Sequence, residues 1–239
     1  MKIGMTLPQF ADTCDEAIEV AQRAEKCGVD GVFVFDHLWP MGQKGKPALS
    51  AFPLLGAIAS STRRIFLGTL VARIGMLPDE VLVGEFQALE AIAPGRVIAG
   101  LGVGDSKSAD ENLSAGIGMA QAAERYTSLR YCVDQLVSDG KEVWLGGSSD
   151  EMISIARSTG AALNLWEGSP DALREFSESG VEVTWGGPIV SSPEDVPTDV
   201  NPKQVGILAD LAQAGATWAV WGWPKSPEVV AKTARALVD

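Results

Sequence analysis

The sequence is poor in the residues that mark several common kinds of functional site. It contains one histidine and three cysteines among 239 residues. The cysteines (Cys14, Cys27 and Cys132) are odd in number and widely spaced, so they fit neither a disulfide framework nor a zinc site. The single histidine, His37, has no nucleophile elbow and no clustered metal ligands around it in the sequence, which argues against a serine hydrolase and a metalloenzyme.

Positive charge and long apolar runs are also scarce. Nineteen Lys and Arg face 31 Asp and Glu, which gives a formal net charge of −12. No basic stripe is present, so we expect no nucleic-acid partner and no membrane partner. No apolar run approaches the roughly 18 residues of a membrane span, and the opening MKIGMTLPQF lacks the pattern of a signal peptide. We therefore expect an acidic cytoplasmic enzyme, folded as one domain over residues 1–239.

Short β-rich runs alternate with longer helical runs along the whole chain, a pattern that predicts parallel βα units. The predicted strands are Lys2–Thr6, Gly31–Phe35, Ile65–Val71, Arg96–Leu101, Glu142–Leu145, Ala162–Leu165, Val181–Trp185 and Thr217–Trp221. The predicted helices are Asp12–Cys27, Ala51–Ser61, Asp79–Ala91, Ala120–Ser138, Asp150–Ser158, Pro170–Ser179, Lys203–Ala214 and Pro227–Leu237. Eight units predict a compact (β/α)8 TIM barrel of the α/β class, because an open doubly wound sheet usually stops at about five or six strands.

Two helix ends and two long loops complete this prediction. Thr13 is the expected N-cap of the first helix, and Gly28 its C-terminal glycine. The polar, glycine-rich stretch Gly102–Gly118 is predicted as a loop with at most one helical turn. The proline-rich stretch Gly186–Pro202 is predicted as a second loop.

Candidate functional residues follow the strands, because the working face of a (β/α)8 barrel lies at the carboxyl ends of its strands. Asp36 and His37 follow the second strand, and Asp105 follows the Gly-Val-Gly at the end of the fourth. A histidine titrates near neutral pH, so His37 is a candidate proton donor or acceptor. The same position also suits a histidine that only packs at the strand end. Asp36 and Asp105 could form the acid pair of a glycosidase, but the other features of the chain have no role in that reaction.

Gly146-Gly147-Ser148-Ser149 ends the fifth strand and opens the helix that follows. Glycines allow close approach of the backbone, and a helix N-terminus offers free N–H groups, so this segment is a candidate phosphate cradle. An ordinary glycine-rich turn with Ser149 as the N-cap is the simpler alternative.

Several tryptophans fall at or just beyond predicted strand ends. As a group they suggest walls for a flat aromatic ligand, although packing at the top of the barrel is the favoured explanation for any one of them. They are Trp39, Trp166, Trp185, Trp221 and Trp223.

The chain resembles the luciferase-like monooxygenase superfamily, and within it the branch of oxidoreductases that depend on the deazaflavin coenzyme F420. The matching pieces run from Met1 to about Trp166, and the final third matches mainly in the rhythm of its elements. The pieces are KIGMTLPQF, VFVFDHLW, RIFLGTLV, APGRVIAGLGVGDS, AERY with SLR, and VWLGGSSDEMISIARSTGAALNLWEG.

The resemblance implies a barrel that binds F420, or alternatively FMN, at its mouth. It implies that Asp36 and His37 lie by the redox face of the ring, and that Asp105 stands where a sugar-phosphate-oxidising relative has a glutamate acid. It further implies a non-prolyl cis peptide at Leu70-Val71 behind the ring. The other positions it places at the cofactor are Gly104, Gly147, Ser148 and Ser149, with the last three holding its phosphate, and Trp166.

Many relatives are about a hundred residues longer, with an insertion around the seventh strand that this chain shortens to Gly186–Pro202. The resemblance predicts hydride transfer between F420 and a small organic substrate, by a protein that we expect to be a homodimer. FMN-dependent monooxygenation and a flavin-binding subunit with little catalysis of its own are the alternatives. Arg73, Lys44 and Lys46 are the basic residues within reach of the mouth. They are candidates for an acidic substrate or the acidic tail of F420, and simple surface charge is favoured for the two lysines.

Overall fold

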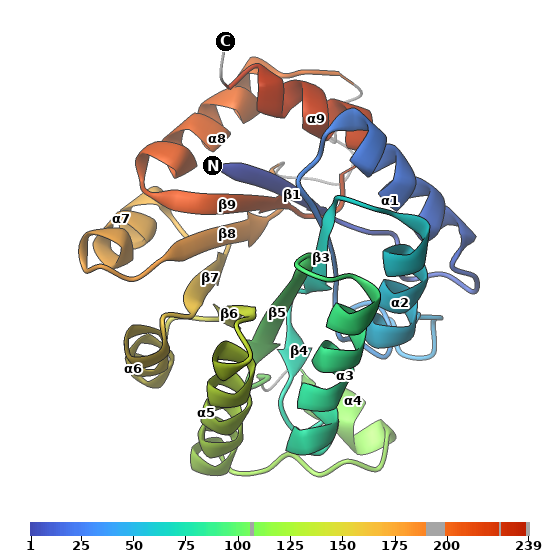
Figure 1. The fold of residues 1–239 in the computed structure, drawn as a ribbon, viewed down its shortest axis with the longest axis vertical. Helices are drawn as coiled ribbons and strands as arrows, with labels where there is room; N and C mark the ends of the chain where they lie inside the picture. The colour runs from blue at the N-terminus through green and yellow to red at the C-terminus, as the bar shows by residue number, and fades with distance from the viewer. Residues whose placement is uncertain (106–107, 190–198, 225, 238–239) are drawn as a thin grey trace.

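The computed structural model describes residues 1–105, 108–189, 199–224 and 226–237, and shows strands surrounded by a ring of helices (Figure 1). The strands are β1 Lys2–Thr6, β2 Gly31–Val34, β3 Phe66–Thr69, β4 Ala72–Arg73, β5 Val97–Gly102, β6 Glu142–Gly146, β7 Ala162–Trp166, β8 Val183–Gly187 and β9 Ala216–Trp221. The helices are α1 Asp15–Cys27, α2 Ala51–Ser61, α3 Asp79–Ile92, α4 Ala109–Ser114, α5 Ala122–Ser138, α6 Asp150–Thr159, α7 Pro170–Glu178, α8 Pro202–Gln213 and α9 Pro227–Arg235.

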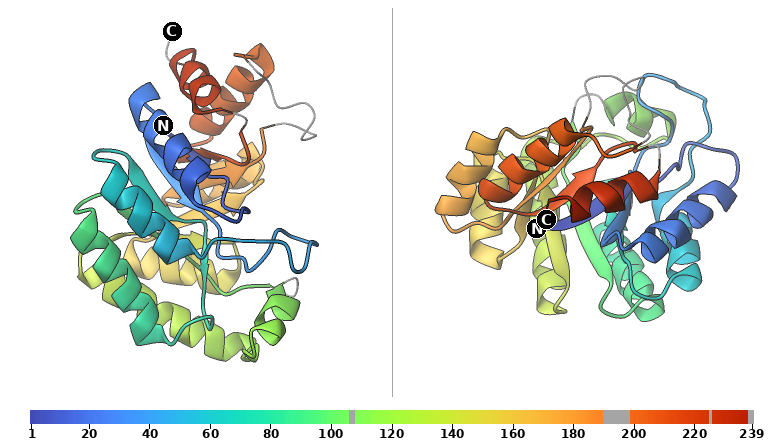
Figure 2. Two further views of the ribbon diagram at one scale, coloured as in Figure 1. Left: turned by 90° about the vertical axis from the view of Figure 1, so that its right-hand side faces the viewer. Right: turned by 90° about the horizontal axis from the view of Figure 1, so that it is seen from above.

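The strands form a closed, parallel barrel. Their order is β3-β2-β1-β9-β8-β7-β6-β5-β4, and β3 also pairs with β5, which closes the sheet on itself. β3 and β4 are two pieces of one barrel strand, separated by Leu70 and Val71, so the barrel has eight strands. The views in Figure 2 show the helices packed around the outside of this sheet. The predicted (β/α)8 fold is confirmed.

Three local predictions differ from the structure. Thr13 does not cap the first helix, which begins at Asp15 after Cys14 and has no side-chain cap. The third strand is interrupted where the Leu70-Val71 peptide bond is cis, as the resemblance implied. The stretch predicted as a loop after the fourth strand contains the helix α4. The predicted end of α1 at Gly28 is confirmed, because this glycine has a φ of 89°, a left-handed conformation that side chains disfavour.

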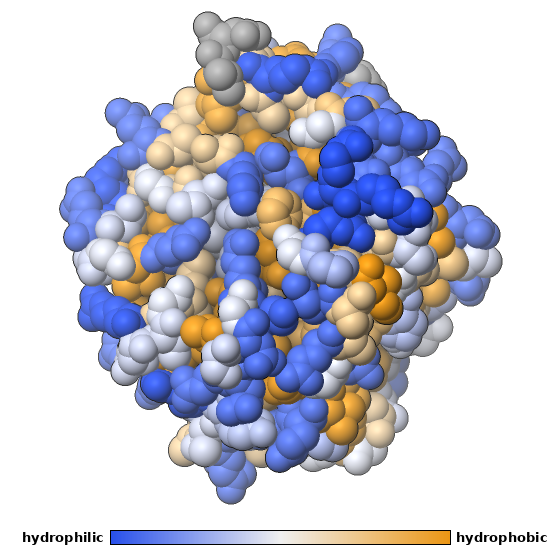
Figure 3. Space-filling model, viewed as in Figure 1, coloured by the Kyte–Doolittle hydropathy of each residue, from blue (hydrophilic) through white to orange (hydrophobic). Residues whose placement is uncertain are grey.

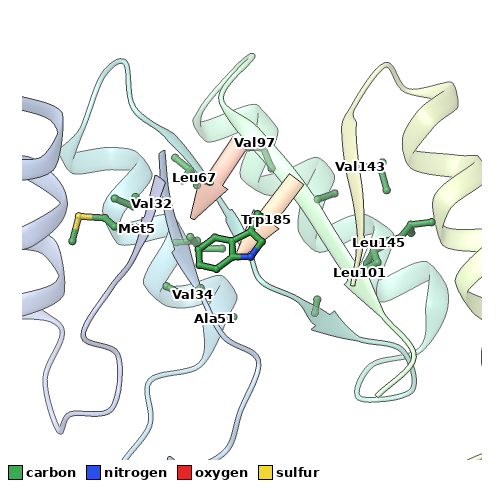
Figure 4. Close-up of a cluster of buried hydrophobic side chains, with 14 of the residues drawn as sticks. Met5, Val32, Val34, Ala51, Leu67, Val97, Leu101, Val143, Leu145 and Trp185 are labelled. Carbon is green, nitrogen blue, oxygen red and sulfur yellow. The ribbon is translucent and has the colours of Figure 1, made fainter. Parts of the chain in front are cut away.

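The core has two parts, divided by the sheet. The larger part fills the space between strands and helices and contains most of the buried aliphatic residues, some of which are labelled in Figure 4. The smaller part fills the barrel interior, where the ring of Trp144 lies 5.1 Å from Phe33 and 5.4 Å from Trp218, centroid to centroid. The barrel is therefore plugged by side chains, as is usual for eight strands, and any ligand must bind above this plug.

The strand positions just above the plug carry glycines. The side chains of Ile98, Trp144 and Val220 point into the barrel. Residues two apart on a strand face the same side, so the positions of Gly100, Gly146 and Gly222 also face the interior. A Cβ on Gly100 would overlap the carbonyl oxygen of Thr69 in the neighbouring strand. At these three positions, the glycines leave the inner wall of the barrel free of side chains.

The outer surface is mainly polar. The face drawn in Figure 3 carries mostly hydrophilic side chains, with hydrophobic ones in small, separate groups. Within the described residues, no helix has the length and apolar character that a membrane span requires.

An ion pair joins the first and last helices of the ring. In α1, Arg23 donates from Nη2 to Glu228 Oε2 of α9 at 2.7 Å and from Nε to Oε1 at 3.0 Å. The hydrogen bond from Arg23 is the main cause that lowers the pKa of Glu228 to about 2. A lowered pKa means that this pair stabilises the fold fully above the ordinary glutamate pKa of 4.5, and that the stabilisation is lost as the pH falls toward 2.

We therefore expect Glu228→Gln to lower the free energy of unfolding by less than about 1 kcal/mol at pH 7, because both side chains are half-exposed and solvent screens the pair. The deficit should shrink steadily as urea unfolding is repeated from pH 5 down to pH 3. Glu19→Gln is the matched control, since Glu19 lies 3.8 Å from the same arginine without that hydrogen bond. A deficit that grows toward low pH would contradict this account.

Candidate active site

His37 lies at the carboxyl end of β2, where the chain leaves the barrel, and its ring is partly buried. Its Nδ1 lies 3.1 Å from each carboxylate oxygen of Glu111 in α4. A carboxylate oxygen accepts hydrogen bonds, so this arrangement fits an imidazole ring whose Nδ1–H donates to Glu111. The other ring nitrogen, Nε2, is the one turned away from this contact.

Arg73, at the end of β4, holds Glu111 from the other side. Its Nη2 lies 2.8 Å from Glu111 Oε2, and its Nε lies 4.0 Å from Asp36 Oδ2. Neither approach lies along an N–H bond, so both are ion pairs rather than linear hydrogen bonds. The Arg73 and Glu111 side chains are only 6% and 5% exposed, so solvent screens this pair weakly.

Asp36 and Asn112 complete the network. The backbone N–H of Arg73 donates to Asp36 Oδ2 at 2.8 Å, and Arg73 Nη1 donates to Asn112 Oδ1 at 3.3 Å. Burial raises the pKa of the Asp36 carboxyl, and the hydrogen bond and positive charge of Arg73 oppose that rise. Together, these residues tie the ends of β2 and β4 to α4 and hold the His37 ring in one orientation.

Asp105 lies apart from this network. It is exposed, and its Oδ1 accepts hydrogen bonds from the backbone N–H and the hydroxyl of Ser108, both at 3.1 Å, at the start of α4. The acid that contacts His37 is therefore Glu111, six residues further along the chain. The proposed acid role of Asp105 stays a prediction. Gly104, next to it, has a φ of 69°, and its carbonyl accepts a hydrogen bond from Arg125 at 2.9 Å.

Sequence reasoning missed Glu111 and Asn112 because they lie in the stretch predicted as a loop. Both are buried on α4, a helix of six residues. The available signal was weak: Ser108 followed by Asp110 and Glu111 is typical of a helix start, where acids favour the first turn. No periodic pattern shows that Glu111 points back toward β2.

At the start of α6, where the phosphate cradle is predicted, the Ser149 hydroxyl is already engaged. Ser149 Oγ accepts from Met152 N at 3.2 Å and pairs with Tyr126 Oη at 2.8 Å, so this hydroxyl caps the helix. The Gly147 amide is used in the sheet, where it donates to Asn164 O at 3.1 Å. Gly147 has a φ of 127°, and a Cβ there would meet no atom within 4 Å, so the space above it is open.

Leu70 and Val71, between β3 and β4, also reach the mouth. Leu70 belongs to the buried plug, and Val71 packs against that plug while its methyl groups face two glycines of the inner wall. A Cβ on Gly146 would lie 3.0 Å from Val71 Cγ2, and one on Gly102 would lie 2.6 Å from the same atom. Val71 therefore forms the wall of the mouth on the β5–β6 side.

The tryptophans predicted as a rim divide into two groups. Trp185 and Trp221 are buried in the core beneath the helices, at 5% and 1% exposure, so their role is packing. Trp166 and Trp223 are partly exposed at the mouth, with ring centroids 5.5 Å apart. Trp39 belongs to neither group. The ammonium nitrogen of Lys44 lies 5.7 Å from the centroid of its ring.

Comparison with known sequences identifies the family of this chain. The profile of the luciferase-like monooxygenase family matches residues 1–137, more than half of the chain. The chain belongs to the luciferase-like monooxygenase family. The resemblance recognised in the sequence is confirmed, and the match includes the segments that carry His37, Arg73 and Glu111 of this luciferase-like protein.

Curated relatives of this luciferase-like protein are named F420-dependent glucose-6-phosphate dehydrogenases. The protein from Nakamurella multipartita is 33% identical over 133 residues, which cover 55% of this chain and 37% of the relative. The one from Beutenbergia cavernae is 37% identical over 128 residues, 52% of this chain and 37% of the relative. The one from Mycolicibacterium smegmatis is 27% identical over 196 residues, which cover 80% of this chain and 53% of the relative. The chain thus spans about 37% to 53% of the length of these relatives.

Solved structures agree with the fold. An F420-dependent secondary alcohol dehydrogenase superposes with a TM-score of 0.78 at 16% identity, covering 100% of this chain and 99% of the other. The EDTA monooxygenase from Chelativorans sp. BNC1 superposes with a TM-score of 0.69 at 12% identity, covering 100% and 93%. At such low sequence identity, the structural similarity shows only that the chain has the same barrel fold.

Proposed function

We propose that this protein binds coenzyme F420 at the carboxyl end of the barrel and transfers a hydride between it and a small organic substrate. The observation that carries the proposal is the buried network that holds His37 at the end of β2, with Nδ1 directed to Glu111 at 3.1 Å. The names of the relatives, which are F420-dependent glucose-6-phosphate dehydrogenases, support the choice of cofactor.

The residues at the mouth fit a cofactor with a planar ring and a phosphate. Gly102 and Gly146 keep the β5–β6 wall free of side chains, with Val71 as its surface. At the start of α6, the open space at Gly147 leads to a helix N-terminus, which attracts anions. Because the Ser149 hydroxyl is occupied by capping, the amides of Ser148 and Ser149 are the better candidates to hold the phosphate.

Bound F420 supplies a two-electron hydride carrier, and the protein supplies orientation and proton handling. His37 would hold or accept a proton at Nε2 as the substrate changes oxidation state, while Glu111 stabilises the resulting imidazolium through Nδ1. Arg73 forms an ion pair with Glu111 on the side away from His37, and Asp36 accepts a hydrogen bond from the backbone of Arg73. Leu70, Val71 and Gly104 are proposed as contacts of the cofactor ring and tail, and Asp105 as a second acid.

The test is equilibrium titration of the purified protein with F420 and, separately, with FMN, followed by fluorescence of the ligand. We expect F420 to bind and FMN to bind at least about tenfold more weakly. FMN binding alone would favour the monooxygenase alternative, and binding of both without turnover of any substrate would favour the cofactor-binding subunit. Binding of neither would reject all the redox functions.

The remaining features are proposals supported by the sequence. A single domain over residues 1–239, a homodimer, a cytoplasmic location and a small-molecule substrate agree with the acidic composition and with the family.

A further inference from the structure

A cluster of aromatic rings lies at the mouth, at the ends of β2, β7 and β9. Phe35 at the end of β2 lies 6.3 Å from Phe10, 5.7 Å from Trp166 and 5.6 Å from Trp223, measured between ring centroids. Trp166 ends β7, and Trp223 follows β9, so distant parts of the chain contribute to one cluster. We call these four residues the aromatic wall.

The aromatic wall is buried at its base and open at its edge. Phe35 is 8% exposed, whereas Trp166 and Trp223 are 37% and 49% exposed. Indole rings contribute large apolar areas, and folding gains most when they are fully buried. Two neighbouring tryptophans held half in solvent at the working face of a barrel therefore indicate a binding surface.

The backbone holds both tryptophans in this exposed arrangement. Trp223 has a φ of 49°, and its N–H donates at 2.8 Å to the hydroxyl of Thr6, which is buried in β1. Glu167, directly after Trp166, has a φ of 55°, and its N–H donates at 2.7 Å to Gly186 O. Left-handed backbone at a residue other than glycine is strained and is concentrated at functional sites.

Glycine also makes room for the aromatic wall beside the catalytic histidine. A Cβ on Gly186 would lie 3.0 Å from the Trp166 ring, so this ring covers a bare stretch of β8. On its other flank, Phe35 lies 6.3 Å from the His37 ring, centroid to centroid. A molecule resting on Trp166 and Trp223 would therefore be near His37.

Among the described residues, both arginines at the mouth are already engaged. Arg73 is buried and paired with Glu111. Arg125 donates to the carbonyl oxygens of Val103 and Gly104. The exposed residue next to Trp166 is an acid, Glu167. Within the described part of the chain, the surface beside Trp166 therefore offers aromatic rings and a carboxylate.

We propose that the aromatic wall binds a planar, uncharged aromatic group of the substrate, in place of the charged phosphate of a sugar phosphate. This inference rests on the proposed function, whose substrate class it defines. It assigns Trp166 to the substrate rather than to the cofactor, with F420 against Val71 and the substrate between the cofactor and the aromatic wall. It adds no chemical step to the hydride transfer.

The test uses isothermal titration calorimetry of the whole protein with 2-naphthol and with glucose 6-phosphate, each with and without F420. We expect 2-naphthol to bind in both cases and glucose 6-phosphate to give no heat of binding. Trp166→Leu and Trp223→Leu should each lower the affinity for 2-naphthol by about five- to tenfold, because each removes one stacked ring. Tyr131→Leu is the matched control, because Tyr131 is a half-exposed aromatic residue on the outer helix α5.

Two results of these titrations would overturn the inference. Glucose 6-phosphate binding that is insensitive to the tryptophan variants would reject the aromatic substrate. Competition between 2-naphthol and F420, or F420 binding weakened by Trp223→Leu, would assign the rings to the cofactor. If a leucine variant misfolds by circular dichroism, Trp223→Phe keeps a ring and should retain binding. If F420 does not bind, the proposed function is rejected. If F420 binds normally but 2-naphthol does not bind, only the role of the aromatic wall in substrate binding is rejected.

Discussion

His37→Ala is expected to slow hydride transfer by about 10²–10⁴-fold while F420 still binds with an affinity within about threefold of the unmodified protein. The reason is that Nε2 of His37 is the proposed proton donor or acceptor at the mouth, whereas the proposed site of the cofactor phosphate is elsewhere, at the start of α6. The measurement is single-turnover loss or gain of F420 absorbance with a substrate found in a panel of alcohols and carbonyl compounds.

Glu111→Gln is the graded comparison for this variant. Glutamine can still accept the hydrogen bond of His37 Nδ1, but it cannot balance the buried charge of Arg73. We expect a smaller loss of rate than for His37→Ala, accompanied by lower thermal stability, since an unpaired buried charge is costly. Turnover of His37→Ala at the unmodified rate would reject the role of the histidine.

Trp144→Ala should lower the free energy of unfolding by about 3–5 kcal/mol. Trp144 is fully buried in the barrel interior, where its ring contacts Phe33 and Trp218, and no neighbouring side chain can fill the space it leaves. For a chain of this size, the change corresponds to a fall in Tm of roughly 6–20 °C. Urea unfolding and calorimetry would both measure it.

The control for this prediction is a large hydrophobic residue outside the core. Leu113 is 75% exposed on α4, and Leu113→Ala should change the free energy of unfolding by no more than about 0.5 kcal/mol. Trp144→Phe should lie between the two, because it keeps a ring in the plug. A Trp144→Ala protein as stable as the Leu113→Ala protein would show that the interior plug does not support the barrel.

The architecture was predictable because it depends on local patterns. Alternating β-rich and helical runs place eight strands in order, and parallel strands bring all their carboxyl ends to one face. This reasoning located His37 and the start of α6 correctly at the mouth. It failed at Thr13, where an isolated polar residue does not determine a cap, and within Gly102–Gly118, where a helix of six residues is too short to show a period. The expected short insertion at Gly186–Pro202 falls largely on residues 190–198, outside the described part of the chain.

The site was only partly predictable. Its single histidine and its family followed from residues and motifs, because those lie in short continuous segments. The partner of His37 did not, because Glu111 is 74 residues away and a strand-end acid, Asp105, is nearer in sequence to the recognised motif.

By itself, the sequence determined a parallel eight-stranded barrel of the luciferase-like family, with one histidine at its mouth. Periodicity and strand order are enough for that, since they follow from the backbone. Only the tertiary structure decided which acid holds His37 and which tryptophans face solvent. Those outcomes depend on the register of β2, β4, β7 and β9 around the closed barrel, which brings distant side chains within hydrogen-bond or stacking distance.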